Sequence, residues 1–356
     1  GRRPGTEGAE AQWPIDEAFS CEERNSHLAG WMNDARRVYH RGGIDSEVDQ
    51  LVSDAIRKRD RARQHFGTGP VTIEDPSSIL AELRLRKSAS EIEQMLYSGK
   101  VASLAHELAM RHSRKGVTEY QLQSVIEGFF SYAGGSGWSY PSIVGCGENA
   151  TILHYTVNSD ECNWDDVILI DAGAEFRGYA SDITRSWPIS GTFSDAQREL
   201  YALVLKAQYA AIDACRVGQP YTAPHEAARR VLAEGLIELG IISQSLEDAL
   251  DTESGELRNW YMHNTSHWIG LDVHDVGVYK PGGTPRTLEE GMCLTVEPGL
   301  YFGAWRPDVD CPPRYANIGI RIEDDVLVSK DGPVVLTADC PKTIEEIESI
   351  VGVPLQ

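Results

Sequence analysis

Residues 167–173 read VILIDAG and residues 179–185 read YASDITR, and these two runs decide the fold. The first run is β-branched and apolar up to Asp171, and the turn-forming sequence EFRG at 175–178 separates it from the second, which predicts a β-hairpin. A symmetric hairpin centred between Phe176 and Arg177 pairs Asp171 with Asp182. Like charges that face each other beside apolar neighbours are destabilising, so the pattern predicts a cation between them. The alternative is an exposed acidic hairpin, which the apolar strand before Asp171 disfavours.

Composition limits the class of protein. The chain has 356 residues, of which 41% are hydrophobic and 24% charged, and its net charge is −21. These values predict a globular protein of about two domains. The negative charge argues against nucleic acid and anionic membranes as partners, and part of it could be metal-binding carboxylate. No apolar run approaches the ~20 residues of a membrane span, and no signal-peptide pattern opens the chain.

The cysteines bear on the cellular compartment. They are odd in number, scattered and without a C-x-x-C pair, which predicts reduced thiols and a cytoplasmic protein. The seven are Cys21, Cys146, Cys162, Cys215, Cys293, Cys311 and Cys340. The first residues, GRRPG, look like a turn rather than a beginning, which leaves room for a targeting segment upstream.

The first seventy residues predict a small α/β unit. Residues 16–34 and 46–65 have helical spacing, and residues 37–40 form a short strand between them. The sequence GTGP at 67–70 breaks this pattern, so we place a domain boundary between residues 67 and 75. The expected domains are therefore 1–70 and 71–356.

A repeated order of elements follows. A helix at 88–112, opened by the capping box SASE, and a second helix after KGVT at 115–118 precede β-rich sequence at 151–190. A helix at 194–216 and another that ends at residue 240 precede β-rich sequence at 267–329. The order predicts an α/β (α+β) domain of two similar halves that close over a shared site.

Four of the ten histidines are candidates for function. His154, His263, His267 and His274 sit among β-branched and glycine residues, whereas the other six lie in helical or N-terminal segments as ordinary surface or boundary residues. A lone histidine of this kind is more often a core residue. Three within residues 263–274 indicate a metal or catalytic site.

Two further carboxylates stand in similar places. Glu297 ends the strand MCLTV and is followed by Pro-Gly, which leaves its side chain at a strand end. Glu323 follows Arg321 on one face of an alternating strand, where a structural ion pair between the two is the alternative explanation. With Asp171, Asp182 and His267 they supply four carboxylates and one imidazole. That ratio of hard oxygen ligands suits two divalent ions such as Mn²⁺, between which a bridging water would become hydroxide near neutral pH.

Six motifs carry a resemblance to a known family. They are LHY at 153–155, IDAG at 170–173, SDITR at 181–185, SHWIGLDVHDVG at 266–277, VEPGLY at 296–301 and GIRIEDD at 319–325. Together they resemble the pita-bread metallopeptidases, most closely aminopeptidase P, the Xaa-Pro aminopeptidase. The resemblance implies a duplicated catalytic domain at 71–356 around a dinuclear site, preceded by a small or truncated N-terminal domain.

The resemblance also implies roles for individual residues. Asp171 would chelate one metal and His267 the other, with Asp182 and Glu323 as bridges. Glu297 would ligate the second metal and move the proton from the nucleophilic water to the leaving nitrogen.

The remaining implied roles concern substrate and support. His154 and His274 would hold the scissile carbonyl and its oxyanion, and His263 would shape the proline side of the pocket. Arg321 and Tyr301 would orient Asp171. The expected activity is hydrolysis of the Xaa-Pro bond at the N-terminus of peptides with proline in second position.

Two features depart from the family pattern. Relatives usually have glycine after the histidine that corresponds to His263, and this chain has Asn264, which tolerates left-handed backbone better than most residues. The chain also begins at a point that resembles the interior of the family's N-terminal domain, so it is either a fragment or has a reduced module. That domain helps to build oligomers, so a homo-oligomer, dimer or tetramer, is expected.

Alternative functions remain open at this point. Prolidase, which cleaves free Xaa-Pro dipeptides, shares all five ligands, and so does methionine aminopeptidase, whose motif context differs. Some relatives of this fold have lost the metal and only bind peptides, which the complete ligand set disfavours. A prolidase needs a cation for the dipeptide carboxylate, and residues 275–296 offer only Lys280 and Arg286.

Overall fold

The computed structural model describes residues 3–33, 35–70 and 72–354. Within it the chain forms two compact units, Gly1–Leu80 and Ala81–Gln356.

The first unit is a small α/β unit. Two short strands, β1 and β2, pair in parallel with Val38 opposite Ile73, and Met32, Val52 and Ala55 are its buried apolar side chains. Its elements are α1 (Gly5–Gln12), η1 (Cys21–Glu23), α2 (Arg24–Trp31), β1 (Arg37–Tyr39), α3 (Ser46–Lys58), α4 (Asp60–Phe66) and β2 (Thr72–Glu74). The helix predicted at 46–65 is thus two helices, and the one at 16–34 is shorter.

The predicted domain boundary can be compared with this unit. Strand β2 lies inside the predicted boundary at 67–75, and its pairing with β1 keeps it in the first unit. That this unit corresponds to part of the family's N-terminal domain stays a prediction.

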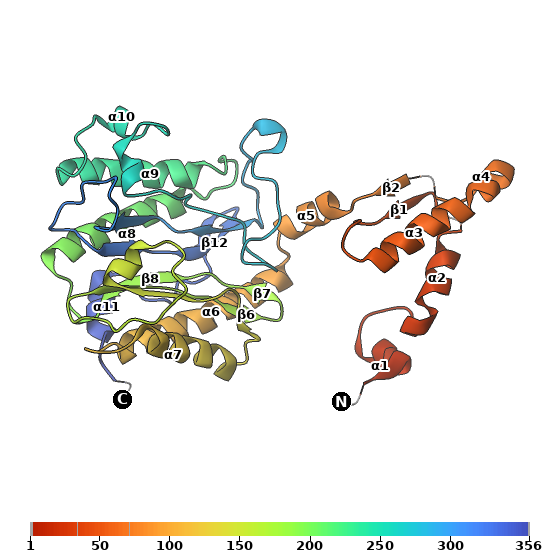
Figure 1. The fold of residues 1–356 in the computed structure, drawn as a ribbon, viewed down its shortest axis with the longest axis horizontal. Coiled ribbons are helices and arrows are strands. Elements are labelled where there is room, and N and C mark those ends of the chain that lie inside the picture. Colours follow the sequence, from red (N-terminus) through yellow and green to blue (C-terminus); the bar gives the residue numbers. More distant parts are fainter. Residues whose placement is uncertain (1–2, 34, 71, 355–356) are drawn as a thin grey trace. The chain divides into compact units, whose positions relative to one another are not determined.

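Two pairs of helices enclose the strands of the second unit. In Figure 1, α8 and α9 lie above the strands and α6 and α7 below them. Helix α5 (Ser77–Leu85) spans the boundary between the units. The other helices of the second unit are α6 (Ala89–His112), α7 (Glu119–Tyr132), η2 (Gly147–Thr151), α8 (Asp195–Ala214), α9 (Ala223–Glu238), α10 (Leu246–Ala249), η3 (Glu256–Asn259), η4 (Pro281–Gly283) and α11 (Ile344–Ile350). Among the described helices, none combines the length and apolar character that a membrane crossing requires.

The strands follow the repeated order expected from the sequence. Sheet β4-β5-β8 comes after α6 and α7, and sheet β13-β12-β9 comes after α8 and α9. The strands are β3 (Gly137–Trp138), β4 (Ile143–Cys146), β5 (Val167–Asp171), β6 (Ala174–Phe176), β7 (Tyr179–Ala180), β8 (Thr184–Pro188), β9 (Cys293–Val296), β10 (Gly299–Phe302), β11 (Ile318–Arg321), β12 (Asp324–Ser329) and β13 (Gly332–Val335).

The central hairpin forms, but in a different register from the predicted one. Its turn is the pair Arg177 and Gly178, with φ of 52° and 84°, rather than a four-residue turn. Two consecutive residues with positive φ are typical of the tight turns that match the twist of a hairpin. Asp171 consequently lies opposite Thr184 rather than Asp182. Because the shift is by two residues, Asp182 stays on the predicted face, diagonal to Asp171.

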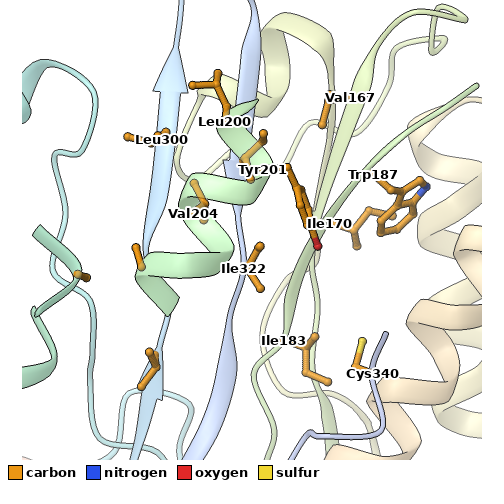
Figure 2. Close-up of a cluster of buried hydrophobic side chains, with 14 of the residues drawn as sticks. Val167, Ile170, Ile183, Trp187, Leu200, Tyr201, Val204, Leu300, Ile322 and Cys340 are labelled. Carbon is orange, nitrogen blue, oxygen red and sulfur yellow. The ribbon is translucent and has the colours of Figure 1, made fainter. Parts of the chain in front are cut away.

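The core lies between the central strands and α8. In Figure 2, Tyr201 and Val204 of α8 lie to one side and Trp187 to the other, with Ile170 and Ile183 of the hairpin between them. All five side chains are fully buried. The indole N–H of Trp187 donates to the hydroxyl of Ser113, just after α6. The segments VILID at 167–171 and ITRSW at 183–187 thus lie in a packed core. This packing fixes the position of Asp171 at the end of the first segment and of Asp182 just before the second.

Candidate metal centre and active site

Asp171 and Asp182 come together at the end of the central hairpin. Asp171 is the last residue of β5, and Asp182 lies between β7 and β8. The hydroxyl of Tyr140 lies 2.5 Å from Oδ1 of Asp171 and also within hydrogen-bond distance of Oδ1 of Asp182, so its single proton is shared between the two carboxylates. The backbone N–H of Asp182 donates to Oδ2 of Asp325 at 3.0 Å. The two carboxylates are therefore held on one side of the sheet by a shared partner, Tyr140.

Arg321 connects Asp171 to a chain of polar side chains. Its Nη2 donates to Oδ2 of Asp171 at 2.7 Å, and its Nη1 donates to the hydroxyl of Tyr301 at 2.9 Å. That hydroxyl lies 2.8 Å from Nε2 of His263, whose Nδ1 donates to the carbonyl of Asn264. Nε2 is consequently the acceptor, and the imidazole is neutral. Burial and the charge of Arg321 lower the pKa of His263 to about 3, in agreement with this tautomer.

The turn after His263 does not need left-handed backbone. Among the described residues, those other than glycine with positive φ are Asn158, Arg177 and Asn317. Asn264 is not one of them, so the substitution of the family's usual glycine leaves the contacts of His263 in place.

His267 presents one ring nitrogen to the carboxylates. Its Nδ1 donates to the carbonyl of Trp268 at 3.0 Å, which leaves Nε2 3.3 Å from Asp182 Oδ2 and 3.6 Å from Glu297 Oε1. A hydrogen bond from Nδ1 to a carbonyl is the usual way in which a protein orients a metal-binding histidine. Its backbone also pairs with Thr295 of β9, so the strand that precedes Glu297 sets its position.

Glu297 and Glu323 complete the group from the second half of the unit. Glu297 follows β9, and its Oε1 accepts from Thr295 Oγ1 at 3.1 Å. Glu323 lies between β11 and β12, and its Oε2 accepts from Thr184 Oγ1 at 2.5 Å. Ligand atoms of Asp182, His267 and Glu323 all lie within 4.8 Å of one another.

The pKa values reveal a site that lacks positive charge. Burial raises the pKa of Asp171 to about 6 and that of Glu297 to about 7, and it raises the pKa of Glu323 well above 4.5. Burial also acts to raise the pKa of Asp182, but the hydrogen bond and charge of His267 outweigh it and lower the value. Burial would lower the pKa of His267, yet Asp182 and Glu297 raise it to about 9. In the metal-free site, protonated His267 thus supplies positive charge that a bound cation would otherwise supply.

This donor set fits divalent metal ions. Three buried carboxylates, the partly exposed carboxylate of Glu297 and one oriented imidazole lie together. In the described part of the chain, Arg321 is the only arginine that bonds any of the four carboxylates. Hard oxygen donors with one imidazole suit ions such as Mn²⁺. Arg321 bonds Asp171 and not Glu323, so it does not account for Glu323 as a simple ion pair.

The two other histidines line the exposed side of the site. The ring of His274 lies 4.4 Å from that of His267, nearly at right angles to it. Burial, and less strongly the charges of His267 and His154, lowers the pKa of His274. His154 is exposed on the loop that follows η2. Both imidazoles are thus free to meet a substrate.

The structure of the loop that carries His154 contradicts the prediction that all cysteines are reduced. A disulfide joins Cys146 to Cys162 at its two ends, so the prediction of seven reduced thiols is wrong for this pair. Their pairing depends on the antiparallel neighbours β4 and β5 and on the return of the loop to Val117, none of which a C-x-x-C pattern encodes. The five others are free, and the cytoplasmic location that rested on reduced thiols stays a prediction.

Some residues of the site were missed by sequence reasoning. Tyr140 has no sequence signal, because its contact with Asp171 and Asp182 arises only when β3 is folded against the hairpin. Thr184 could have been found, because alternation places it on the same face as Asp182. Its hydroxyl accepts from Arg321 Nε at 3.0 Å and donates to Glu323.

Comparison with known proteins identifies the family. Residues 93–330 match metallopeptidase family M24. The chain belongs to this family. It is 40% identical to the Xaa-Pro aminopeptidase of Escherichia coli (strain K12) over 351 residues, which cover 99% of this chain and 78% of that protein. It is 34% identical to Xaa-Pro aminopeptidase 3 of Rattus norvegicus over 98% of this chain and 67% of that protein.

Solved structures of M24 peptidases have the same fold. The aminopeptidase PepP of Pseudomonas aeruginosa superposes with a TM-score of 0.91 at 40% identity, over 98% of this chain and 78% of that one. The proline aminopeptidase P II from Yersinia pestis gives 0.91 at 41% identity, over 99% and 80%. The mixed helix and sheet fold is therefore the pita-bread fold expected from the sequence, and the protein is a metal-dependent peptidase.

Proposed function

We propose that this M24 peptidase hydrolyses the bond between the N-terminal residue and a proline in second position, in tripeptides and longer peptides. The observation that carries the proposal is the clustering of Asp171, Asp182, His267, Glu297 and Glu323. Hydrogen bonds through Tyr140, Arg321 and Thr184 link the carboxylates of Asp171, Asp182 and Glu323, and Nε2 of His267 lies close to Asp182 and Glu297. The relatives named above, which carry the name Xaa-Pro aminopeptidase, support this substrate class over the prolidase alternative.

Two divalent ions, proposed to be Mn²⁺, would be held by these five residues. Asp171 would chelate one ion and His267 the other, Asp182 and Glu323 would bridge, and Glu297 would ligate the second. When bound, such ions lower the pKa of water and polarise a carbonyl oxygen. With a neutral His267, the four carboxylates less Arg321 give a charge of −4 + 1 = −3, which is close in size to the +4 of two such ions.

Glu297 is proposed to move the proton. The N–H of Glu297 is fixed by the carbonyl of Thr265 at 2.9 Å, and its carboxylate is oriented by Thr295. In the metal-free site burial raises the pKa of Glu297 to about 7, and a bound cation would lower that pKa and keep the carboxylate able to accept a proton. Glu297 would thus take a proton from the attacking water and deliver it to the proline nitrogen.

The histidines are proposed to position the substrate. His274 and His154 would hold the scissile carbonyl as negative charge develops on its oxygen. His263, kept neutral by Tyr301 and Asn264, would form the side of the pocket that receives proline. Arg321 would orient Asp171 from behind, together with Tyr301.

The charge near the site favours longer peptides over dipeptides. A dipeptide puts a carboxylate directly on the proline, and that anion needs a cation in a site rich in Asp and Glu. Arg286, one of two candidates, bonds Glu82 through Nη1 at 3.1 Å and Nη2 at 2.5 Å and donates to the carbonyl of Val278 at 2.7 Å. Its side chain is 10% exposed, and all its groups point to these partners. The other candidate, Lys280, is exposed.

The test compares Ala-Pro with Ala-Pro-Ala and a longer analogue at equal manganese. We expect kcat/KM to be at least tenfold lower for the dipeptide, since about 1.4 kcal/mol of uncompensated charge suffices for that factor. Arg286→Met should leave the ratio unchanged, because Glu82 already holds the guanidinium; Lys280→Met is the matched control on the same segment. Faster cleavage of the dipeptide would assign the chain to prolidase, and full activity after exhaustive chelation would contradict the metallopeptidase mechanism.

Four further points stay predictions: manganese as the native metal, assembly into a dimer or tetramer, the absence of nucleic acid and membrane partners, and the cytoplasmic location. Mass measurement of the assembled protein and metal analysis of material purified without added metal would test the first two.

A further inference from the structure

A buried ion pair lies directly beside His274. Nζ of Lys87 is 3.2 Å from Oδ2 of Asp275, and both side chains are 1% exposed. Lys87 lies between α5 and α6, just before the N-cap Ser88. Asp275 is the residue after His274. Replacement of a whole buried pair by apolar side chains is often neutral, whereas removal of one partner leaves the other charge buried without it.

The lysine is anchored to the strand that leads to Glu297. Its backbone N–H donates to the carbonyl of Gly291 at 2.8 Å, and the preceding Arg86 forms an isolated antiparallel bridge with Met292. Met292 immediately precedes β9, so Lys87 is a fixed point relative to the end of that strand.

The aspartate closes the loop that carries two histidines. The backbone N–H of Asp275 donates to the carbonyl of Trp268 at 2.9 Å, and Trp268 bridges to Leu294 of β9. Residues 268–275 therefore form a closed loop whose base is bonded to β9, with His267 just before it and His274 at its far end. Arg84 adds a second cation, which bonds both Asp275 and Asp272.

The loop is shaped to admit the ion pair. A Cβ at Gly270 would lie 2.3 Å from Oδ2 of Asp275, 2.7 Å from Cε of Lys87 and 3.0 Å from its Nζ. Gly270 does not have the positive φ that would itself require glycine. Glycine is thus needed at position 270 because the side chains of Lys87 and Asp275 come so close to it, and not because of its backbone conformation.

We propose that Lys87 is a positioning residue for His274: through Asp275 it fixes the end of the loop, so that the His274 imidazole stands over His267 and faces the substrate carbonyl. The proposal rests on the function proposed above for His274. Without the Lys87 side chain, Asp275 keeps Arg84 and its backbone hydrogen bond to Trp268, but its carboxylate loses its contact with the segment that is anchored at Gly291 and Met292. The loop end can then move relative to the strand that carries Glu297. Displacement by about 1 Å is enough to lower a catalytic rate by roughly two orders of magnitude.

The experiment is a double-mutant cycle at saturating metal. His274→Ala is expected to lower kcat by roughly 10²–10³, the effect of one lost oxyanion donor. Lys87→Met should lower kcat by roughly 10–10² with KM and metal content changed by less than about threefold. In the His274→Ala background, Lys87→Met should change kcat by less than about threefold, because the group through which it acts is gone.

Lys342→Met is the matched control. Lys342 is a mostly buried lysine, 13% exposed, whose Nζ lies 2.6 Å from Oδ2 of Asp324. Asp324 keeps its contact with Arg185 when the Lys342 amine is removed. Lys342→Met should change kcat by the same factor in the parent protein and in the His274→Ala variant.

Gly270→Ala provides a second route if Lys87→Met does not fold. It separates the two charges without deleting either, and it should show the same dependence on His274 as Lys87→Met. A Lys87 or Gly270 effect of equal size in both His274 backgrounds would overturn the positioning role while leaving the proposed function intact. An unchanged kcat in His274→Ala itself would instead refute the role proposed for His274, and the positioning proposal with it.

Discussion

Removal of the disulfide between Cys146 and Cys162 should destabilise the protein without abolishing activity. The bond closes a loop between residues separated by 16 positions. A crosslink over a loop of about 15 residues restricts the unfolded chain enough to contribute about 3 kcal/mol. The double variant Cys146→Ala, Cys162→Ala should therefore lose about 3 kcal/mol of its free energy of unfolding.

Activity should survive because a second device holds the same loop. The carboxylate of Glu119 is fully buried and accepts from the backbone N–H groups of Cys146 and Asp160, from Asn149 Nδ2 and from the hydroxyl of Tyr155. These donors lie on both sides of His154. The loop thus keeps its path when the sulfurs are removed, and kcat should fall by less than about threefold.

The contribution of the disulfide to the free energy of unfolding can be measured by urea unfolding, followed by tryptophan fluorescence, with and without a thiol reductant. Reductant should lower the stability of the parent protein to that of the double variant and should leave the double variant unchanged. Cys215→Ala, which removes a buried free thiol, is the control and should retain the response to reductant. A parent protein whose unfolding curve does not respond to reductant would refute the reasoning, and so would a tenfold loss of kcat in a fully folded double variant.

Three other outcomes are expected. Asp182→Asn should lower metal content and turnover together, by roughly two orders of magnitude, as measured by metal analysis and rate on one preparation. Tyr140→Phe removes the donor shared by Asp171 and Asp182 and should weaken metal affinity roughly 10–100-fold in a metal titration. Burial lowers the pKa of His106 from 6.5 to about 4, so the unfolded chain binds the proton first as pH falls. Relative to His106→Gln, the free energy of unfolding should drop by about 2 kcal/mol between pH 7 and pH 5, which urea titrations at each pH would measure.

Local pattern predicted the part of the site that depends on strand alternation. The sequence placed Asp171 and Asp182 on one face of a hairpin, although it centred the turn one position too early. The turn at Arg177 and Gly178 moves the register by two residues, and an even shift preserves the face of every side chain. The prediction of the face was therefore robust to an error in turn length, whereas the prediction of direct cross-strand pairing was not.

Contacts between distant segments could not be read from the sequence. Tyr140 reaches Asp182 across 42 positions, and Lys87 reaches Asp275 across 188. Neither contact follows from periodicity or spacing, because each depends on how one helix or strand packs on another. The disulfide was missed for the same reason, since its cysteines meet only when β4 and the loop back from it are both in place.

The site lies where the two halves of the catalytic unit meet. The first half supplies Asp171 and Asp182, and the second supplies His267, Glu297 and Glu323. The backbone N–H of Glu323 donates to the carbonyl of Thr184 at 3.0 Å, so the strand after the hairpin and the end of β11 are joined at the carboxylates themselves. Buried carboxylates in such a position repel one another and oppose closure of the two halves. Cations that bind only the closed form would offset this repulsion. The carboxylates that lower the stability of the metal-free protein would thus make the stability of its folded state depend on the bound metal.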